Sequence, residues 1–593
     1  MDLLTWVVIG IGLYWLGILV LGRLGWIPSS VNTTGPITTI RTKRGRILLN
    51  RLAQPKRLWR ALANFGVGSA IIVMVGAFLM LLFSAIISLL SPTQTDIQQP
   101  QNVLVIPGVN EFLPLEVAPE IIFGLVVGLI IHEGGHGLLC RVEDIEIKSM
   151  GVALIAFIPL GAFVEPDQES AENASRGSQI RMFSAGVTGN FIVTIIVFAL
   201  LFGPVAGSIA VAPGAAVGGV LPNSGAEAAG IDGGDRIDSI DGVAVEDYDD
   251  LTDRLNDLPD RTVTVGVNGD RTVTVERTLL VTAATPDGPS PVTEGSTIHA
   301  IDGESMYTTL ALYDALEGER EVEVSWETPD GENRTDTIPI GSLVTVASGP
   351  MNDAGVEHGS QVVITSIDDQ QVVSTSDLQA ILANATPDST VPVEYWKDGE
   401  LHTVDVTLGE ASGGGGFLGI MTASGITGMD VSDFGIQEYP SDAYLALLGG
   451  GDPADDPLGI ADSFFAKLVI AIFLPLASIV LGGVLPYNFA GFTSDIANFF
   501  VIEGPLAGLG GGVFLLANLL FWTGWINLNL GIFNCIPAIP LDGGHILRSS
   551  LEAVFAQLSI DVSHRLISYL VGAIAIVMLL SFLIMIFGAG MLG

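Results

Sequence analysis

Long apolar runs alternate with polar sequence in the N-terminal and C-terminal parts of the chain. Each run is close to the roughly 20 residues that a helix needs to cross the apolar part of a bilayer. The pattern therefore predicts a polytopic α-helical membrane protein with about six to eight spans. The runs are Leu3–Leu21, Phe65–Leu90, Ile121–Leu139, Ile180–Leu201, Leu468–Leu485, Val513–Ile536 and Leu566–Phe587.

Basic residues between the runs predict how the spans are oriented. Such residues stay on the cytoplasmic side of a membrane. The first span is therefore expected to run inward, the second outward, the third inward and the fourth outward. The basic residues between the first two runs are Arg41, Lys43, Arg44, Arg46, Arg51, Lys56, Arg57 and Arg60, and those after the third run are Arg141, Lys148, Arg176 and Arg181.

The C-terminal runs leave one crossing unexplained. Arg548 and Arg565 precede the last run and predict a cytoplasmic position for the chain before it. An odd number of crossings is then needed between Phe464 and Asp542, whereas the two apolar runs there give an even number. Either Asn488–Gly512 contains a third crossing, or one apolar run does not cross.

A shorter apolar stretch, Val152–Val164, contains Pro159 and Gly161. These residues disfavour a helix, so the stretch is expected to form a strand or hairpin at membrane depth. Protein must bury such a backbone, because lipid offers it no hydrogen bonds.

The polar block between the fourth and fifth runs contains an internal repeat. Ile237-Asp238-Ser239-Ile240-Asp241-Gly242 recurs from Ile298 to Gly303 and again from Ile364 to Asp369. Three copies of one α+β unit explain the pattern. The helical patterns that follow each copy are Tyr248–Leu258, Tyr307–Leu316 and Thr375–Leu382, and the strand pairs after them are Val263–Val275, Val322–Ile338 and Val391–Val406.

The first copy resembles the PDZ domains of membrane proteases. The resemblance is carried by Leu221–Gly230 followed by Ile231-Asp232-Gly233-Gly234-Asp235, and Gly349–Gly355 keeps part of it in the third copy. The middle copy lacks this segment. In PDZ domains a peptide ligand adds as a strand to a sheet edge. Peptide binding by at least one copy and a purely spacing role both remain open.

Composition supports a membrane protein with one strongly acidic soluble block. Hydrophobic residues form 49% of the chain and the mean hydropathy is +0.55. The net charge is −40, and 46 acidic against 8 basic residues lie between Phe202 and Ser463, with Lys397 as the single lysine. Such a surface stays hydrated at high salt, which suggests a salt-rich habitat. It also argues against nucleic-acid binding, which needs a basic surface.

The two cysteines, Cys140 and Cys535, lie in apolar sequence and imply no disulfide framework. Cys140 follows His136 by four residues, yet both cysteines are expected to be small core residues rather than metal ligands. The N-terminal apolar run has no cleavage-site pattern and is read as a span, not a signal peptide.

The third run contains the chemistry, as His132-Glu133-Gly134-Gly135-His136. Histidines at i and i+4 share one helix face and suit a tetrahedral Zn²⁺, and the intervening Glu is placed to act as general base. Ionisable groups within a span are costly and mark functional sites. Gly134 and Gly135 weaken the helix, so another backbone, of the protein or its substrate, is expected to approach them.

Catalytic zinc commonly has three protein ligands and one water, so a third ligand is needed. Asp542 is the candidate, at the end of Asn534–Asp542 and before Gly543 and Gly544. Pro537 and Pro540 stop a helix, and the glycines permit a turn that can direct the carboxylate inward. By itself this segment could equally be a simple helix end. His545 is expected either to contact a metal ligand or simply to face the cytoplasm, and it is not an expected metal ligand itself.

Taken together, these motifs resemble the site-2 protease family, in a salt-adapted archaeal form. The resemblance covers about Ile121 to Ile546 and includes Gly151–Asp167 and Ser184–Asn190. It implies one Zn²⁺ per chain held by His132, His136 and Asp542, with Glu133 as catalytic base. It also implies that Asn190 and Asn534 contact the substrate or the oxyanion. Three PDZ-like units are more than members of the family usually carry.

We expect seven consecutive parts. They are an N-terminal membrane hairpin (1–118), a catalytic membrane core (119–204), PDZ-like domain 1 (205–283), a degenerate PDZ-like domain 2 (284–342), PDZ-like domain 3 (343–410), a linker (411–463) and a C-terminal membrane core (464–593).

The expected function is intramembrane zinc-dependent proteolysis of regulatory membrane proteins. The resemblance implies that the multi-pass enzyme cuts single-span substrates in the cell membrane, after a site-1-type protease has trimmed them. Its active site would face the cytoplasm and its PDZ-like domains the outside, where they would exclude untrimmed substrates. The alternatives are a catalytically inactive scaffold whose PDZ-like domains bind exported tails, and a zinc transporter.

Overall fold

The computed structural model describes residues 3–27, 31–34, 37–90, 106–110, 113–155, 158–286, 288–560 and 562–592. Its internal contacts divide the chain into two units. The helical unit consists of residues 1–210, 442–493 and 502–593, and the modular unit of residues 211–441 and 494–501. Each unit is described by itself.

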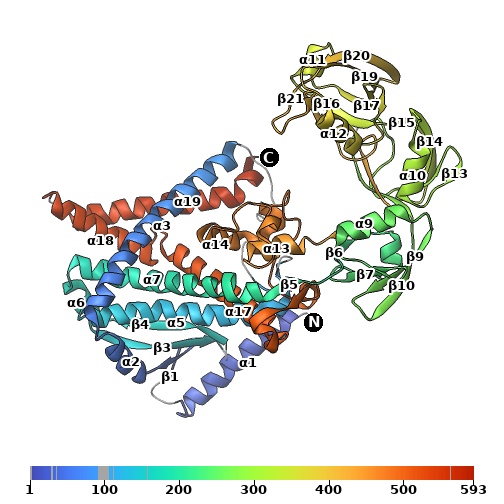
Figure 1. Ribbon diagram of the computed structural model, residues 1–593. Helices are drawn as coiled ribbons and strands as arrows, with labels where there is room; N and C mark the ends of the chain where they lie inside the picture. The colour runs from blue at the N-terminus through green and yellow to red at the C-terminus, as the bar shows by residue number, and fades with distance from the viewer. Residues whose placement is uncertain are drawn as a thin grey trace. The chain divides into compact units, whose positions relative to one another are not determined.

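Long helices dominate the helical unit (Figure 1). Five of them are long and apolar enough to cross a membrane, which agrees with the predicted polytopic membrane protein. These five are α3 (Lys56–Leu90), α5 (Ala118–Val142), α7 (Arg176–Leu200), α17 (Gly512–Asn534) and α19 (His564–Leu592). The remaining helices of eight or more residues here are α1 (Leu3–Arg23), α2 (Arg44–Leu52), α14 (Phe464–Phe473) and α18 (Asp542–Gln557), and the shorter ones include α6 (Gln168–Asn173).

The apolar run Leu468–Leu485 does not form the predicted spanning helix. It is divided among α14, a 3-10 turn at Leu474–Leu476 and the single turn α15 (Ala477–Val480). Pro475 removes a backbone donor there. Asn488–Gly512 contains only short elements, so α17 is the one helix of spanning length between Phe464 and Asp542. Of the two explanations for the crossing count, a run that does not cross is the one that fits.

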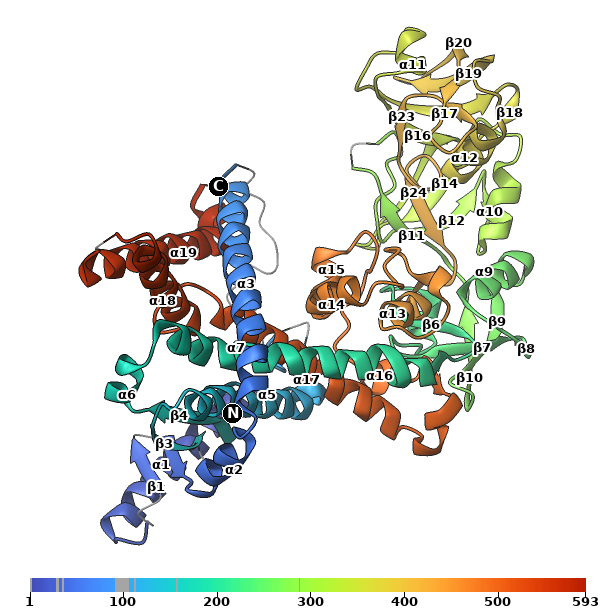
Figure 2. The ribbon, with the colours of Figure 1, turned by 60° about the vertical axis from the view of Figure 1, so that its left-hand side comes forward.

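Helices α5, α7 and α17 pack against one another along their length, as both views of the ribbon show (Figures 1 and 2). Glycines make the close approach possible. A Cβ on Gly124 of α5 would lie 2.9 Å from the carbonyl oxygen of Trp522 on α17. A Cβ on Gly135 would lie 2.6 Å from the carbonyl oxygen of Ala185 on α7. Small residues at helix contacts are typical of membrane bundles, where packing replaces the hydrophobic effect.

The stretch predicted as a strand or hairpin at membrane depth is a hairpin. It consists of β3 (Ile147–Ile155) and β4 (Ile158–Pro166), which pair antiparallel with Met150 opposite Val164. Two N-terminal strands, β1 (Val31–Thr34) and β2 (Ile37–Arg41), extend it into a sheet of order β1-β2-β3-β4. The sheet thus ends at β4, which packs against α5.

The modular unit confirms the predicted threefold α+β repeat. Each module has a helix that lies between two strand pairs in the sequence, and a polar N-cap begins each of these helices, at Asp247, Thr308 and Ser374. Module 1 is β6 (Ala215–Val220), α8 (Gly225–Ala228), β7 (Arg236–Ile240), β8 (Val243–Ala244), α9 (Tyr248–Asp257), β9 (Thr262–Val267) and β10 (Arg271–Glu276). Module 2 is β11 (Leu279–Ala284), β12 (Thr297–Ile301), β13 (Glu304–Ser305), α10 (Thr309–Leu316), β14 (Glu321–Glu327) and β15 (Asn333–Pro339). Module 3 is β16 (Ser342–Val346), α11 (Pro350–Asp353), β17 (Gln361–Ile367), β18 (Gln370–Gln371), α12 (Thr375–Asn384), β19 (Thr390–Lys397) and β20 (Glu400–Thr407).

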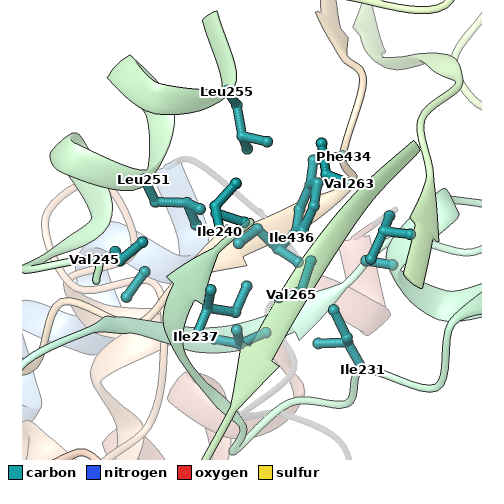
Figure 3. Close-up of a cluster of buried hydrophobic side chains, with 14 of the residues drawn as sticks. Ile231, Ile237, Ile240, Val245, Leu251, Leu255, Val263, Val265, Phe434 and Ile436 are labelled. Carbon is teal, nitrogen blue, oxygen red and sulfur yellow. The ribbon is translucent and has the colours of Figure 1, made fainter. Parts of the chain in front are cut away.

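The segment after module 3, expected to be a linker over 411–463, is partly built into all three modules. Its strands β23 (Ile420–Thr422), β24 (Met429–Ser432) and β25 (Ile436–Glu438) join β16, β11 and β6 in turn. Figure 3 shows Phe434 and Ile436 among the buried side chains of module 1. The chain therefore forms modules 1, 2 and 3 in order, and then adds one strand each to modules 3, 2 and 1. The expected domain boundaries remain predictions, with this interleaving added.

A buried ion pair joins the two passes of the chain between modules 1 and 2. The side chains of Arg277 and Asp433 are 0% and 5% exposed. Arg277 donates to the carbonyl oxygens of Leu255 and Leu258 at the end of α9, and Asp433 accepts the main-chain N–H of Thr309 at the start of α10. Both charges thus have several partners, which a buried pair requires in order to be stable.

Candidate metal and catalytic site

Helix α5 places two imidazoles on one face, as the i, i+4 spacing predicts. The Nε2 atoms of His132 and His136 are 3.2 Å apart, and the two rings meet edge to face. The carboxylate oxygen Oδ2 of Asp542 lies 3.1 Å from each Nε2. Asp542 is the first residue of α18, directly after the Pro-broken segment. The structure therefore brings together the three side chains expected to bind the metal.

These three donor atoms have the spacing that a tetrahedral cation requires. Ligands about 2.0–2.1 Å from zinc are roughly 3.3 Å apart in a tetrahedral site. Oδ2 of Asp542 is buried and has no hydrogen-bond partner among the described residues, although two imidazole nitrogens lie beside it. A buried carboxylate oxygen that faces two imidazole nitrogens without a hydrogen bond is expected of a ligand to a cation. Within the described residues this is the single cluster of three such side chains able to hold a metal.

Burial by itself would raise the pKa of Asp542, but the two imidazoles outweigh it and hold this pKa well below its usual range. The carboxylate is therefore charged at neutral pH, the form that binds a metal.

The second nitrogen of each histidine faces a protein group. Nδ1 of His136 lies 2.8 Å from the carbonyl oxygen of Met182, and Nδ1 of His132 lies 3.3 Å from the side-chain amide of Asn190. If Nε2 faces the metal, Nδ1 carries the proton and needs an acceptor. Turning the amide of Asn190 by 180° would supply Oδ1, which is buried and otherwise has no partner among the described residues. Such contacts set the tautomer and orientation of a metal ligand.

Asn190 and Asn534 occupy different surroundings. Asn190 is fully buried behind His132, on the side away from its metal-facing nitrogen. Asn534 donates to the carbonyl oxygen of Leu530, one turn back on α17. The roles expected for both, contact with the substrate or the oxyanion, remain predictions.

Glycines allow the backbones of α5 and α7 to lie close to the two histidines. A Cβ on Gly186 of α7 would lie 2.6 Å from Nε2 of His136 and 2.8 Å from Nδ1 of His132. The backbone approach expected at Gly135 is confirmed, since the carbonyl of Ala185 lies there. Apart from its chain neighbours and the adjacent backbone of α5, Gly134 has no described atom within 4 Å of the place a Cβ would take. The backbone expected beside Gly134 is therefore not one from the described part of this chain.

Two further glycines shape the turn that carries Asp542. A Cβ on Gly543 would lie 2.3 Å from the carbonyl oxygen of Cys535, and one on Gly544 would lie 2.8 Å from the backbone of Ala538. The helix start thus packs directly on the Pro-broken segment. Only glycine allows this contact, which is why two of them follow the candidate ligand.

The carboxylate of Glu133 points to the hairpin. Its Oε2 accepts a hydrogen bond of 2.8 Å from the main-chain N–H of Val164 in β4. The sequence offers no indication of this contact, or of that between His136 and the carbonyl of Met182, because every residue type but proline carries the same main-chain groups. Gly186 lies within the Ser184–Asn190 pattern, but nothing in the sequence indicates its contact with the histidines.

Cys140, Cys535 and His545 lie outside the donor cluster. Both cysteines are buried, free thiols, and they pack in apolar clusters. His545 stacks on Phe183 with ring centroids 4.5 Å apart, and burial lowers its pKa. These positions agree with the core role expected for the cysteines.

Beyond Met182 and His545, helices α6, α7, α18 and α19 line a cavity of about 560 Å³. Its walls carry Arg176 and Arg548, which both contact Glu552. Charged side chains form part of its lining, so it can hold water, and Met182, whose carbonyl faces His136, also lines it.

Comparison with known proteins gives concordant matches. The family model described as peptidase family M50 matches residues 120–579. The regulator of sigma-E protease RseP of Salmonella typhimurium is 24% identical over 496 residues, which cover 77% of this chain and 95% of that protein. A putative zinc metalloprotease of Rhizobium meliloti is 27% identical over 187 residues, 25% of this chain and 49% of that protein. An uncharacterized protein of Methanocaldococcus jannaschii is 30% identical over 165 residues, 27% of this chain and 42% of that protein.

Proposed function

The chain belongs to peptidase family M50 and is a multi-pass membrane metalloprotease, and on this premise we propose that it is a site-2-type zinc protease that cuts within or next to membrane-spanning segments. The match over residues 120–579 confirms the resemblance noted in the sequence. The observation that carries the proposal is the cluster of His132, His136 and Asp542, whose first two members lie on a helix able to cross a membrane.

One zinc ion per chain fits this cluster. The three donor atoms are 3.1–3.2 Å apart, and imidazole and carboxylate are common zinc ligands. When bound, zinc supplies the Lewis acid that activates a water molecule and polarises the scissile carbonyl. His136 is oriented by the carbonyl of Met182, and His132 by Asn190.

Glu133 acts as the proton carrier of the reaction. It takes a proton from the attacking water and returns it to the amine nitrogen of the leaving segment. A helical substrate segment must unwind before its peptide bond can reach these groups. Water is proposed to approach the site from the cavity lined by Arg176, Met182 and Arg548, because the carbonyl of Met182 contacts His136.

The positions of charged residues suggest the sidedness of the enzyme. The basic cluster between Arg41 and Arg60 and the arginines after α5 favour a cytoplasmic position for the end of α5 that holds the site. The acidic modules are then proposed to lie on the extracytoplasmic side of the cell membrane.

The substrates we propose are single-span regulatory membrane proteins that a site-1-type protease has already trimmed. The three modules, if they are PDZ domains, would exclude untrimmed substrates. One relative is named a regulator of sigma-E protease, which supports a regulatory role for the present chain.

Zinc content and cleavage, measured on the same purified protein, test the proposal. Wild-type protein should bind one zinc and cut a helical membrane substrate. Glu133→Ala should keep the zinc and lose activity by about 10²–10⁴-fold, because proton transfer contributes that much. His132→Ala should lose the zinc as well.

Three outcomes would contradict it. Cleavage that persists in Glu133→Ala would remove Glu133 from the chemistry. Zinc without cleavage would favour the scaffold, whose modules bind exported tails. Zinc flux into sealed vesicles that carry the protein, without cleavage, would favour the transporter.

A further inference from the structure

The sheet of order β1-β2-β3-β4 ends at β4, and one main-chain group of this strand contacts the candidate general base. Val164 lies opposite Met150 of β3. Its N–H nevertheless donates to Oε2 of Glu133, 2.8 Å away, so it points away from β3 and toward α5. Within the described residues, this is the one hydrogen bond that the Glu133 carboxylate accepts.

This donor is held in place by structure on both of its sides. The side chain of Val164 lies against Gly137 of α5, where a Cβ on the glycine would be 3.3 Å from one of its methyl groups. The strand is fixed through β3 to β2, where Val152 lies opposite Ile40. A main-chain N–H in a paired strand has no rotamers, so it directs the carboxylate more firmly than a side chain would.

We propose that the main-chain N–H of Val164 is a positioning group for the reaction. It holds Oε2 of Glu133 and thereby presents the other oxygen, Oε1, for proton transfer. The proposal rests on the proposed function, in which Glu133 is the general base. The N–H of Val164 then takes part in the reaction, and strands β3 and β2 hold it in place.

Replacement of one amide by an ester removes this N–H and leaves the side chain unchanged. The test introduces α-hydroxyvaline at position 164 by nonsense suppression. A hydrogen bond to a charged group is strong, so kcat should fall about 10–100-fold while KM and zinc content stay as in the wild type. A merely structural role would instead lower the zinc content or raise KM.

Ala162 provides the matched control. It lies two residues from Val164 on the same strand, opposite Val152, so its N–H faces the same side. The ester at Ala162 should change kcat by less than about twofold, since no contact with Glu133 involves it. An equal loss of kcat at both positions, an unchanged kcat at Val164, or a gain there would overturn the proposal.

Amide exchange tests the contact without any reaction. In metal-free protein labelled with ¹⁵N-valine, the N–H of Val164 should exchange slowly with solvent. Glu133→Ala should accelerate its exchange about tenfold or more, whereas the amide of Val152, within the same hairpin, should be unaffected. Equal exchange rates of the Val164 N–H in wild-type protein and Glu133→Ala would overturn the proposal. This measurement decides the question even if the ester variant does not fold.

The two hypotheses fail in different ways. If wild-type protein binds zinc but cuts no substrate, the proposed function fails whatever Val164 does. If wild-type protein cuts in a Glu133-dependent manner and the Val164 ester keeps full kcat, only the positioning role fails.

Discussion

Gly186 of α7 lies against both histidines of the donor cluster, and its missing side chain is what allows them to converge. The nearest atoms to a Cβ there would be Nε2 of His136 and the ring of His132. Neither ring can yield without losing its place beside Asp542. At the scale of single residues, the site thus depends on empty space as much as on its ligands.

Gly186→Ala is expected to abolish zinc binding. A methyl group 2.6 Å from Nε2 of His136 must displace the imidazole that binds the metal. Zinc content of the purified variant, measured by atomic emission, checks this. Gly134→Ala is the control and should keep its zinc, because no described atom beyond its chain neighbours and the adjacent backbone of α5 lies within 4 Å of that methyl group. Normal zinc content in Gly186→Ala would show that the histidines bind the metal in another arrangement.

Substitutions of Asn190 distinguish two roles of its buried amide, the orientation of His132 and contact with the oxyanion. If it accepts the proton on Nδ1 of His132, Asn190→Ala should weaken zinc affinity about 10–100-fold, the usual effect of losing such a partner. Asn190→Asp, which keeps an acceptor, should restore much of the affinity. Competition with a chelator measures both. Unchanged affinity with a lower kcat would favour the oxyanion role expected from the family resemblance.

At the scale of elements, the bundle is tied together where α5 ends. Glu143, the C-cap of α5, has a side chain that is only 3% exposed. It accepts hydrogen bonds from Arg60 of α3 and from Arg181 and Ser178 of α7. Three helices thus meet at one carboxylate at the end of α5. Burial alone would raise the pKa of Glu143, but Arg181, Ser178 and Arg60 lower it from 4.5 to about 2.

Acidification should therefore weaken the bundle through Glu143. A lowered pKa in the folded state contributes stability that is fully present above about pH 4.5 and is lost as the pH falls toward 2. Glu143→Gln should lower the Tm of the detergent-solubilised protein at pH 7 by roughly a few degrees. It should also flatten the dependence of Tm on pH between about 4.5 and 2. A variant with the same pH dependence as the wild type would assign the acid sensitivity to other carboxylates.

The whole molecule is organised by a chain that passes twice through its three modules. Strands β23, β24 and β25 return through modules 3, 2 and 1, and the buried pair of Arg277 and Asp433 fastens the two passes. None of the modules is complete in the segment of sequence that holds its repeat. Any experiment that removes them must respect this interleaving.

Removal of the modules should widen the choice of substrate. A deletion of Val220–Glu410 would leave β25 and its neighbour Phe434 without the core that they complete. Replacement of residues 212–441 by a short Gly/Ser linker removes the outgoing and returning strands together. The variant should then cleave a full-length substrate that wild-type protein leaves intact until it is trimmed. Identical substrate choice in both proteins, with normal zinc content, would count against a filter.

The sequence alone determined the helices, the histidine pair and the repeat, because the interactions that specify them are between residues close together along the chain. The i, i+4 histidines, the apolar runs that became α3, α5, α7, α17 and α19, and the threefold repeat all depend on neighbours along the chain. Asp542 could be named because prolines and glycines mark the turn that carries it.

Only the tertiary structure decided the remainder. Pairing of β25 with β6 joins residues over 200 positions apart, and three-residue strands leave no pattern of their own. The break in Leu468–Leu485 depends on how its short helices pack, because apolar composition alone predicts a span. The contacts of Val164 and Met182 use main-chain groups, which are alike at nearly every position, so only the folded chain shows which of them meet the site.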